Sequence, residues 1–197
     1  MIRIGILGNI GSGKSYVAKN FGYPIFNADH EVAKIYKEDK KIFVKLNKKL
    51  PKYIHTFPTH KSQIAKAILS NTNNLKKIIA IVHVEIKHKM NLFLKKNRNK
   101  KIVILDVPLL LENKLNKKRD ILIFVQSKNS EIYKRLVKRK NFNKKLFNMF
   151  KKIQLPTNYK KKKSHFIIKN DFTKRTIRNN IKNILRKIYN ERSSFRY

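Results

Sequence analysis

A glycine-rich segment near the start of the chain carries residues suited to phosphate chemistry. Residues 8–15 read GNIGSGKS and match G-x-x-x-x-G-K-[ST], the motif of a loop that binds a nucleoside triphosphate. Its glycines permit the positive φ angles by which successive backbone N–H groups surround a phosphate. In this pattern the lysine contacts the β- and γ-phosphates, and the following hydroxyl binds Mg²⁺. The expected nucleotide-binding residues are Gly8, Asn9, Ile10, Gly11, Ser12, Gly13, Lys14, Ser15 and Tyr16.

The segments on either side of this motif support the same interpretation. A strand-like apolar run (2–7) precedes it, and an amphipathic helical pattern with Val17, Ala18 and Phe21 follows it. The alternative is a glycine-rich turn that binds nothing, and the agreement of strand, loop and helix favours the phosphate-binding loop. The loop alone does not separate a kinase from a motor, a GTPase or a helicase.

Asp29 is the first carboxylate after the second strand-like run (23–27). It is expected at the carboxyl end of a parallel strand, the edge where such sheets bind ligands. A carboxylate there can accept a hydroxyl proton or hold Mg²⁺ through water. Asp29 is also a good N-cap for the helical pattern that follows, and the residues alone leave both roles open.

Arg135 and Arg139 are four residues apart, so on a helix they share one face. The chain otherwise prefers lysine, and the planar guanidinium fork suits phosphate oxygens. The alternative is a pair of solvated arginines on a basic helix.

The elements that must position these residues alternate between strands and helices. Apolar runs of strand character recur along the chain, and segments of helical spacing lie between them. This order predicts an α/β fold with a parallel sheet covered by helices, each strand being buried on both faces. The runs are 2–7, 23–27, 101–107, 120–125 and 165–169. The last helix carries one apolar stripe, with Thr173 as its cap: Ile177, Ile181, Ile184, Leu185 and Ile188.

Two helical stretches interrupt the alternation and divide the predicted domain. Residues 1–197 are expected to form one domain whose core comprises 1–29, 99–139 and 164–197. An inserted helical subdomain is expected at about 30–98 and a second helical excursion at about 140–163. An enzyme that transfers phosphate must exclude water, and these stretches are the candidates for the closing parts.

The composition limits the possible classes of protein. The chain has 197 residues, no cysteine and a net charge of +38. Its basic residues are mostly lysines spread through nearly every segment, which favours solvated faces over a dedicated nucleic-acid site. The absence of cysteine fits a reducing compartment, and neither a signal peptide nor a membrane span is expected. We therefore expect a cytoplasmic protein with no membrane partner.

Five segments, in order and at comparable spacing, resemble the dephospho-coenzyme A kinase family. They are GILGNIGSGKSYVA, GYPIFNADHEVA, LDVPLLLENKL, EIYKRLVKR and HFIIKN, and they extend over nearly the whole chain. The resemblance implies a P-loop nucleoside-triphosphate hydrolase-type three-layer fold with a five-stranded parallel sheet, a helical coenzyme A-binding insertion and a helical lid. It also implies transfer of the γ-phosphoryl group of ATP, with Mg²⁺, to the ribose 3′-hydroxyl of dephospho-coenzyme A, the final step of coenzyme A biosynthesis.

The resemblance also assigns roles to individual residues. Asp29 is implied as the base for the acceptor hydroxyl, Lys14 as a catalytic cation, and Arg135 with Arg139 as the cations that neutralise the transferring phosphoryl group. Asp106 is a supporting candidate for organising Mg²⁺ beside Ser15. The implied substrate-binding residues, besides Asp29, are His83, Pro108, Leu109, Leu110 and Glu112, although the leucines also suit an ordinary core and His83 a plain helix position.

Departures from the family pattern bear on the site. Asn9 replaces a usual glycine, which we expect to be tolerated because asparagine adopts positive φ more readily than other side chains. Asn27 stands in place of the first aspartate of a D-A-D element.

Two other functions stay open from the sequence alone. One is another small-molecule P-loop kinase that acts on a nucleoside or nucleotide, and the other is a basic nucleic-acid-binding protein with a vestigial loop. The second predicts steeply salt-dependent binding without turnover. We expect ATP and dephospho-coenzyme A as partners, no specific nucleic acid, and a monomer or small homo-oligomer.

Overall fold

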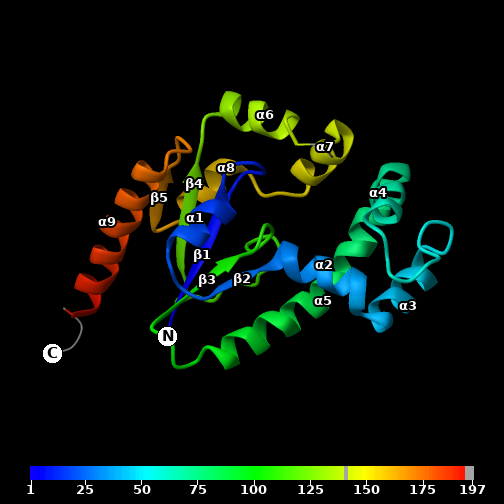
Figure 1. The fold of residues 1–197 in the computed structure, drawn as a ribbon, viewed down its shortest axis with the longest axis horizontal. Helices are drawn as coiled ribbons and strands as arrows, with labels where there is room; N and C mark the ends of the chain where they lie inside the picture. The colour runs from blue at the N-terminus through cyan, green and yellow to red at the C-terminus, as the bar shows by residue number, and fades with distance from the viewer. Residues whose placement is uncertain (140–141, 194–197) are drawn as a thin grey trace. The chain divides into compact units, whose positions relative to one another are not determined.

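The computed structural model describes residues 1–139 and 142–193, with side chains as far as Asn190. Its central feature is a five-stranded sheet of order β2-β3-β1-β4-β5 (Figure 1). β1 pairs with β3 and β4, and β4 pairs with β5, each time in parallel. All the predicted strands are present, and the predicted α/β class is confirmed: β1 (Ile2–Gly8), β2 (Ile25–Asn27), β3 (Ile102–Asp106), β4 (Ile121–Gln126) and β5 (Phe166–Lys169).

The chain divides into two compact units. The sheet unit comprises Met1–Phe26, Asn99–Lys140 and Leu155–Tyr197, and the helical unit comprises Asn27–Arg98 and Asn141–Gln154. Residues 140, 141 and 194–197 of the predicted lid and core lie outside the described residues. The helices are α1 (Lys14–Asn20), α2 (Ala28–Glu38), α3 (Lys40–Lys49), α4 (Lys61–Ser70), α5 (Thr72–Lys96), α6 (Asn129–Val137), α7 (Lys144–Lys152), α8 (Thr157–Lys162) and α9 (Lys174–Ser193).

One face of the sheet is covered by α1 and α9. Alternate residues of the strands point to this face, and they form a buried cluster with Val17, Ala18 and Phe21. The predicted stripe of α9 is confirmed, because Ile177, Ile181, Ile184 and Ile188 are buried in the same cluster and Leu185 packs against it. The Thr173 hydroxyl accepts a hydrogen bond from the Thr176 N–H at 3.4 Å, as expected of a cap.

β5 does not fit the prediction that every strand is buried on both faces. It lies at the edge of the sheet, where Ile168 is fully buried but Ile167 is 46% exposed. An edge strand has a neighbour on one side only, so an apolar run can end at the surface. The apolar composition of residues 165–169 alone does not reveal this position.

The helical unit is organised by the long helix α5. Its buried residues recur every three or four positions, the spacing of one helical face. α2, α3 and α4 pack against α5 and contribute buried aliphatic residues of their own, among them Ile35, Leu46 and Ile68. The buried apolar residues of α5 are Leu75, Ile78, Val82, Ile86 and Met90.

A buried ion pair joins the start of β1 to the residue before β4. The Arg3 Nη2 donates to Asp120 Oδ2 at 2.9 Å and to the Leu115 carbonyl at 3.3 Å. The Lys117 N–H donates to the same Asp120 oxygen at 2.8 Å. The Arg3 and Asp120 side chains are only 10% and 2% exposed. Each buried charge therefore needs the other to offset the cost of its removal from water.

Asp120→Asn is therefore expected to lower the free energy of unfolding by about 3 kcal/mol, because it leaves the buried Arg3 guanidinium without an opposite charge. Chemical denaturation of the variant and the parent chain measures the difference. Glu85→Gln is the matched control: it removes a partly exposed pair with Lys89 at 4.0 Å, for which a loss below about 1 kcal/mol is expected. Equal losses in the two variants would contradict the role given to the Arg3–Asp120 pair.

Candidate active site

The loop between β1 and α1 has the backbone shape that phosphate binding requires. Gly8, Gly11 and Gly13 adopt φ of 152°, 83° and 88°. A Cβ atom at Gly8 would lie 2.6 Å from Ser12 Oγ and 2.8 Å from the Val125 carbonyl oxygen, so only glycine fits there. Gly13 caps α1 in the left-handed conformation, where L side chains are strained.

Two side chains outside the loop hold its shape. The Ser12 carbonyl accepts hydrogen bonds from Ser127 Oγ at 2.9 Å and from Asn170 Nδ2 at 2.8 Å. Ser127 follows β4, and Asn170 follows β5 and is itself buried. The sequence reasoning missed Ser127 as a contributor to the loop, because this residue does not belong to the loop motif.

Lys14 lies against the loop that precedes it. Its Nζ donates to the Asn9 carbonyl at 2.9 Å, and the residue is only 9% exposed. Ser15 follows in the first turn of α1 and is partly buried, whereas Tyr16 is 42% exposed. Ser12 is 1% exposed, and its Oγ has no hydrogen-bond partner among the described residues. The loop thus brings a lysine ammonium and two hydroxyls close to the backbone amides.

Asn9 does not adopt the positive φ on which its expected tolerance was argued. Among the described residues other than glycine, positive φ occurs at Lys114 and Phe172. The Asn9 side chain is instead held by a distant contact, since its Oδ1 accepts a hydrogen bond from Thr157 Oγ1 at 3.1 Å. Replacing glycine at this position therefore costs no backbone strain and adds a contact to α8.

α6 packs directly on the phosphate-binding loop. A Cβ atom at Gly11 would lie 2.9 Å from Ile132 and 3.0 Å from Leu136, which are both buried residues of α6. The Arg135 guanidinium lies 4.2 Å from the centroid of the Phe172 ring, a cation–π contact. The Phe172 ring would in turn lie 3.3 Å from a Cβ at Gly13, so Arg135, Phe172 and the start of α1 are neighbours.

Arg139 does not share a helical face with Arg135. α6 ends at Val137, and Arg139 lies beyond its C-cap in a turn, where the Arg139 N–H donates to the Leu136 carbonyl at 3.0 Å. Both arginines are exposed. The prediction of a common face required both arginines to lie within one helix, but α6 ends before Arg139.

Asp106 ends β3, next to the strand that leads into the loop. The preceding Leu105 is in register with Gly5 of β1, and Asp106 is 3% exposed. Carboxylate and hydroxyl oxygens such as those of Asp106 and Ser15 are the ligands that Mg²⁺ prefers, and this metal usually takes only one or two carboxylates plus substrate phosphates. The described residues contain no cluster of three or more His, Asp or Glu that could hold a metal by itself.

The segment after β3 lies partly in the core. Leu110 is fully buried and would contact a Cβ at Gly5, so we correct its assignment from substrate binding to packing. Pro108 and Leu109 are partly exposed.

Glu112 contacts the segment that leads into α8. Its Oε1 accepts a hydrogen bond from the Leu155 N–H at 2.9 Å and lies 3.8 Å from Lys160 Nζ. The Glu112 and Lys160 side chains are 9% and 2% exposed. Burial lowers the pKa of the Lys160 ammonium, and Glu112 opposes that shift. The polar partner of the buried Glu112 carboxylate is Lys160, which has no distinctive position in a lysine-rich sequence.

Asp29 and His83 belong to the helical unit. Asp29 lies in the first turn of α2 and is exposed, and the N-cap is Asn27, whose Oδ1 accepts a hydrogen bond from the His30 N–H at 2.8 Å. The cap alternative for Asp29 is therefore wrong. His83 lies on α5, and its Nε2 is buried without a hydrogen-bond partner among the described residues. Burial, with a smaller effect of Lys87, lowers the pKa of His83.

The parallel sheet, the loop and the helix at its end define a P-loop kinase-type α/β protein, and comparisons with known proteins give the family. The sequence profile described as Dephospho-CoA kinase matches residues 2–175. A dephospho-CoA kinase from a Wolbachia of Brugia malayi is 32% identical over 92% of this chain and 95% of its own length. The chain belongs to the dephospho-CoA kinase family.

Solved structures agree on the fold. A Thermus thermophilus crystal structure has a TM-score of 0.73 and 26% identity, covering 94% of this chain and 97% of its own. The dephospho-CoA kinase of Campylobacter jejuni has a TM-score of 0.61 at 18% identity, over 94% and 96% of the two chains. The predicted family, kinase class and place in coenzyme A biosynthesis are confirmed, and the two alternative functions are not favoured.

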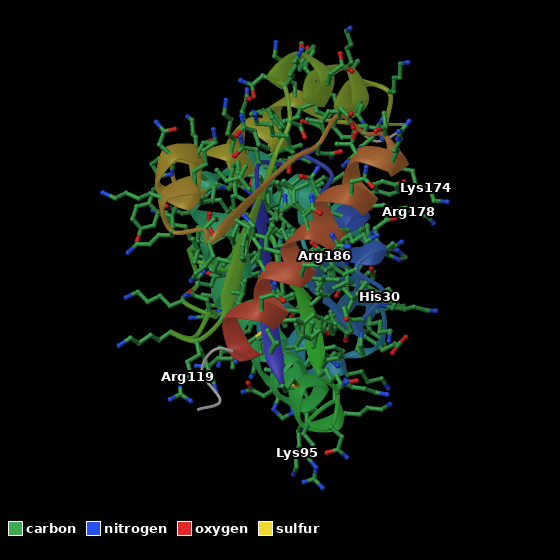
Figure 2. The ribbon with its side chains drawn as sticks, turned by 90° about the vertical axis from the view of Figure 1, so that its left-hand side faces the viewer. His30, Lys95, Arg119, Lys174, Arg178 and Arg186 are labelled. Carbon is green, nitrogen blue, oxygen red and sulfur yellow. The ribbon has the colours of Figure 1, made fainter. Side chains whose placement is uncertain are left out.

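The basic side chains come from many elements of both units. Figure 2 labels Lys174, Arg178 and Arg186 on α9, Arg119 before β4, and Lys95 near the end of α5. Charge drawn from so many elements agrees with the interpretation of solvated lysines, and the absence of a specific nucleic-acid partner stays a prediction. No helix in the described part of the chain has the length and apolar character needed to cross a membrane.

Glu112→Gln and Lys160→Met are each expected to destabilise the chain by about 2 to 4 kcal/mol, because either change leaves one buried charge without its partner. The double variant should lose clearly less than the sum of the two. Chemical denaturation of the four chains closes the cycle. Additive losses would mean that the two side chains are not coupled.

His83 is expected to make the folded chain less stable as the pH falls. Its pKa is lowered on folding, so the unfolded chain binds a proton first, and stability drops as the pH passes downward through the ordinary histidine pKa of about 6.5. His83→Gln should therefore lose less stability than the parent between about pH 7.5 and pH 5. Parallel denaturation series at the two pH values measure this, and identical losses would show that His83 contributes nothing.

Proposed function

We propose that this chain transfers the γ-phosphoryl group of ATP to the ribose 3′-hydroxyl of dephospho-coenzyme A, with the residues below in the stated roles. The proposal rests mainly on one observation. A phosphate-binding loop with its lysine, its hydroxyls and its positive-φ glycines is assembled in a chain of the dephospho-CoA kinase family.

The loop and Lys14 hold the triphosphate of ATP. Backbone N–H groups of residues 8–15 and the start of α1 face a phosphate in loops of this shape. The Lys14 ammonium, which contacts the Asn9 carbonyl, is close enough to the loop to exchange this partner for phosphate oxygens. The loop thus fixes the donor end of the reaction by geometry and charge.

Ser15 and Asp106 fit a role in holding Mg²⁺, with Asp29 as a further candidate through water. Ser15 starts α1, and Asp106 ends the strand next to β1. Bound Mg²⁺ supplies positive charge that neutralises the β- and γ-phosphate oxygens.

Asp29 accepts the proton of the acceptor hydroxyl. Its side chain is exposed in the first turn of α2, and the N-cap of that helix is Asn27. As the 3′-oxygen forms its bond to the γ-phosphorus, the bond from that phosphorus to the β,γ-bridging oxygen breaks and ADP leaves. The proton released by the hydroxyl goes to Asp29.

Arg135 and Arg139 neutralise charge on the transferring phosphoryl group. Arg135 is held beside the loop by Phe172, and both guanidinium groups are exposed to a substrate. Charge that spreads over the phosphoryl oxygens is stabilised by such fixed cations. The helical insertion (30–98) and the lid (140–163) exclude water on closing, which agrees with their helical content. His83, Pro108, Leu109 and Glu112 stay candidates for the acceptor side.

Purified chain is expected to convert ATP, Mg²⁺ and dephospho-coenzyme A to ADP and a 3′-phosphorylated product, detected by mass spectrometry. Asp29→Asn should bind ATP normally and lose about 10²- to 10⁴-fold in turnover, the usual contribution of a general base. Glu31→Gln is the control, since Glu31 lies in the same first turn of α2 and undergoes the same change of charge.

The absence of product with the parent chain would overturn the proposed reaction. Product from Asp29→Asn at the parent rate would remove Asp29 from the role of base while leaving the reaction itself in place. Nucleosides and nucleotides offered as acceptors in place of dephospho-coenzyme A test the kinase alternative, and we expect little product from them.

A further inference from the structure

The backbone of Phe172 adopts a conformation that the roles proposed above do not explain. Its φ is 65°, in the left-handed region that bulky L side chains rarely adopt. Phe172 lies in the turn between β5 and α9, and its side chain is partly buried. A backbone of this kind is strained, persists only where its surroundings impose it, and occurs most often at functional sites. The contacts of Phe172 therefore indicate what the strained turn contributes.

The turn is fixed by the side-chain amide of Asn170. Its Oδ1 accepts a hydrogen bond from the Phe172 N–H at 2.8 Å, and its Nδ2 donates to the Ser12 carbonyl at 2.8 Å. Asn170 is only 4% exposed, so water competes little for either bond. The residue that carries the strained backbone is thus tied, through one amide, to the carbonyl that orients the phosphate-binding loop.

The Phe172 ring lies near both α1 and α6. A Cβ atom at Gly13 would lie 3.3 Å from Phe172 Cε1, so the ring packs against the start of α1. The Arg135 Cζ lies 4.2 Å from the ring centroid, well within the distance at which a guanidinium is attracted to an aromatic face. The left-handed turn therefore places an aromatic face beside the loop, and Arg135 of α6 lies over it.

Arg135 is a side chain that gains from such a support. It is exposed, and the ion pairs of the described residues do not include it. A long side chain that must become ordered during a reaction loses rotamer entropy at that step. An aromatic face restrains the guanidinium without occupying its N–H donors, whereas a carboxylate partner would occupy them. The contact with Phe172 thus orders the cation and leaves it able to bind phosphate oxygens.

We propose that Phe172 is a positioning residue that orders the Arg135 guanidinium for the transferring phosphoryl group, and that its left-handed backbone is retained for this contact. The inference rests on the proposed function, because the role of Arg135 belongs to that function. Phe172 acts through Arg135 and takes no part in the chemical step itself.

The test is a series of variants of the full chain at position 172. Phe172→Tyr keeps the aromatic face, Phe172→Leu keeps an apolar side chain on the strained backbone, and Phe172→Gly removes the side chain and the strain together. Tyr159→Leu is the matched control, because it removes another aromatic face of the sheet unit, over which Lys163 Nζ lies at 5.8 Å. Each chain is measured for kcat, for the KM of ATP and of dephospho-coenzyme A, and for its melting temperature.

Phe172→Leu and Phe172→Gly should each lower kcat about 3- to 30-fold, the factor that corresponds to a lost cation–π contact. Both KM values should be unchanged, because Arg135 acts on charge that develops in the transition state. Phe172→Tyr and Tyr159→Leu should keep the parent kcat. Phe172→Gly should melt at a higher temperature than Phe172→Leu, because glycine adopts this φ without strain. The loss of kcat should therefore not follow the loss of stability.

Two further measurements ask whether Phe172 acts through Arg135. In an Arg135→Gln background, Phe172→Leu should cause no additional loss of kcat, since the side chain that it positions is already absent. In nuclear magnetic resonance spectra, the Arg135 Nε–H signal should carry an upfield ring-current shift in the parent chain and in Phe172→Tyr. Phe172→Leu should lack this shift.

Several results would overturn the proposal. They are an unchanged kcat in Phe172→Leu, a kcat that follows the melting temperature across the series, a raised KM for ATP as the main effect, or a full effect of Phe172→Leu in the Arg135→Gln background. A parent chain that shows the ring-current shift but forms no product from dephospho-coenzyme A would overturn the proposed function instead. Hydrolysis of ATP, which transfers the same phosphoryl group to water, would then be the rate on which the series decides the role of Phe172.

Discussion

The hydrogen bonds accepted by the Ser12 carbonyl are the interaction on which the donor side of the site depends. A loop with three positive-φ glycines has many other conformations, and ordering glycine costs more entropy than ordering any other residue. Ser127 and Asn170, which follow β4 and β5, both donate to this carbonyl. The position of the loop is therefore restrained by the sheet. The amides are then oriented before a phosphate arrives, which lowers the entropic cost of binding it.

A second set of contacts holds the loop from α8. Thr157 bonds the Asn9 side chain, and Glu112 holds the Leu155 N–H and lies beside Lys160. The segment 155–160 thereby connects the phosphate-binding loop with the segment after β3, and it belongs to the sheet unit. The predicted lid began at about 140 and ended at about 163, but these buried contacts anchor its last part. The contacts of residues 155–160 thus place this part of the predicted lid within the sheet unit.

The strands and the loop could be predicted from the sequence because their signals are local. Apolar runs and a fixed glycine spacing report directly on buried strands and on backbone shape. Some errors came from contacts between distant residues, and others from the positions where helices begin and end. Asn9 was expected to be tolerated because asparagine accepts positive φ, whereas its φ is not positive and its side chain accepts a hydrogen bond from Thr157. Leu110 and Glu112 belong to one motif, yet the first packs on Gly5 and the second binds Leu155. For Asp29, the choice between cap and base turned on whether α2 begins after Asn27 or after Asp29.

Acidic residues are few in this chain, and several of them have structural roles. Against 49 basic residues the chain has 11 acidic ones. Asp120 neutralises the buried Arg3, Glu112 lies beside the buried Lys160, and Asp39 caps α3 by accepting from the Ile42 N–H. Lysine can replace almost any exposed residue at little cost, since a solvated ammonium needs no partner. Arg3 and Lys160 have no such freedom, because each of these buried cations lies beside a carboxylate that offsets its desolvation. In this chain the type of a basic residue therefore says little about its role. Position says more: Lys14 lies beside the loop and Lys160 beside Glu112, whereas most other lysines are solvated.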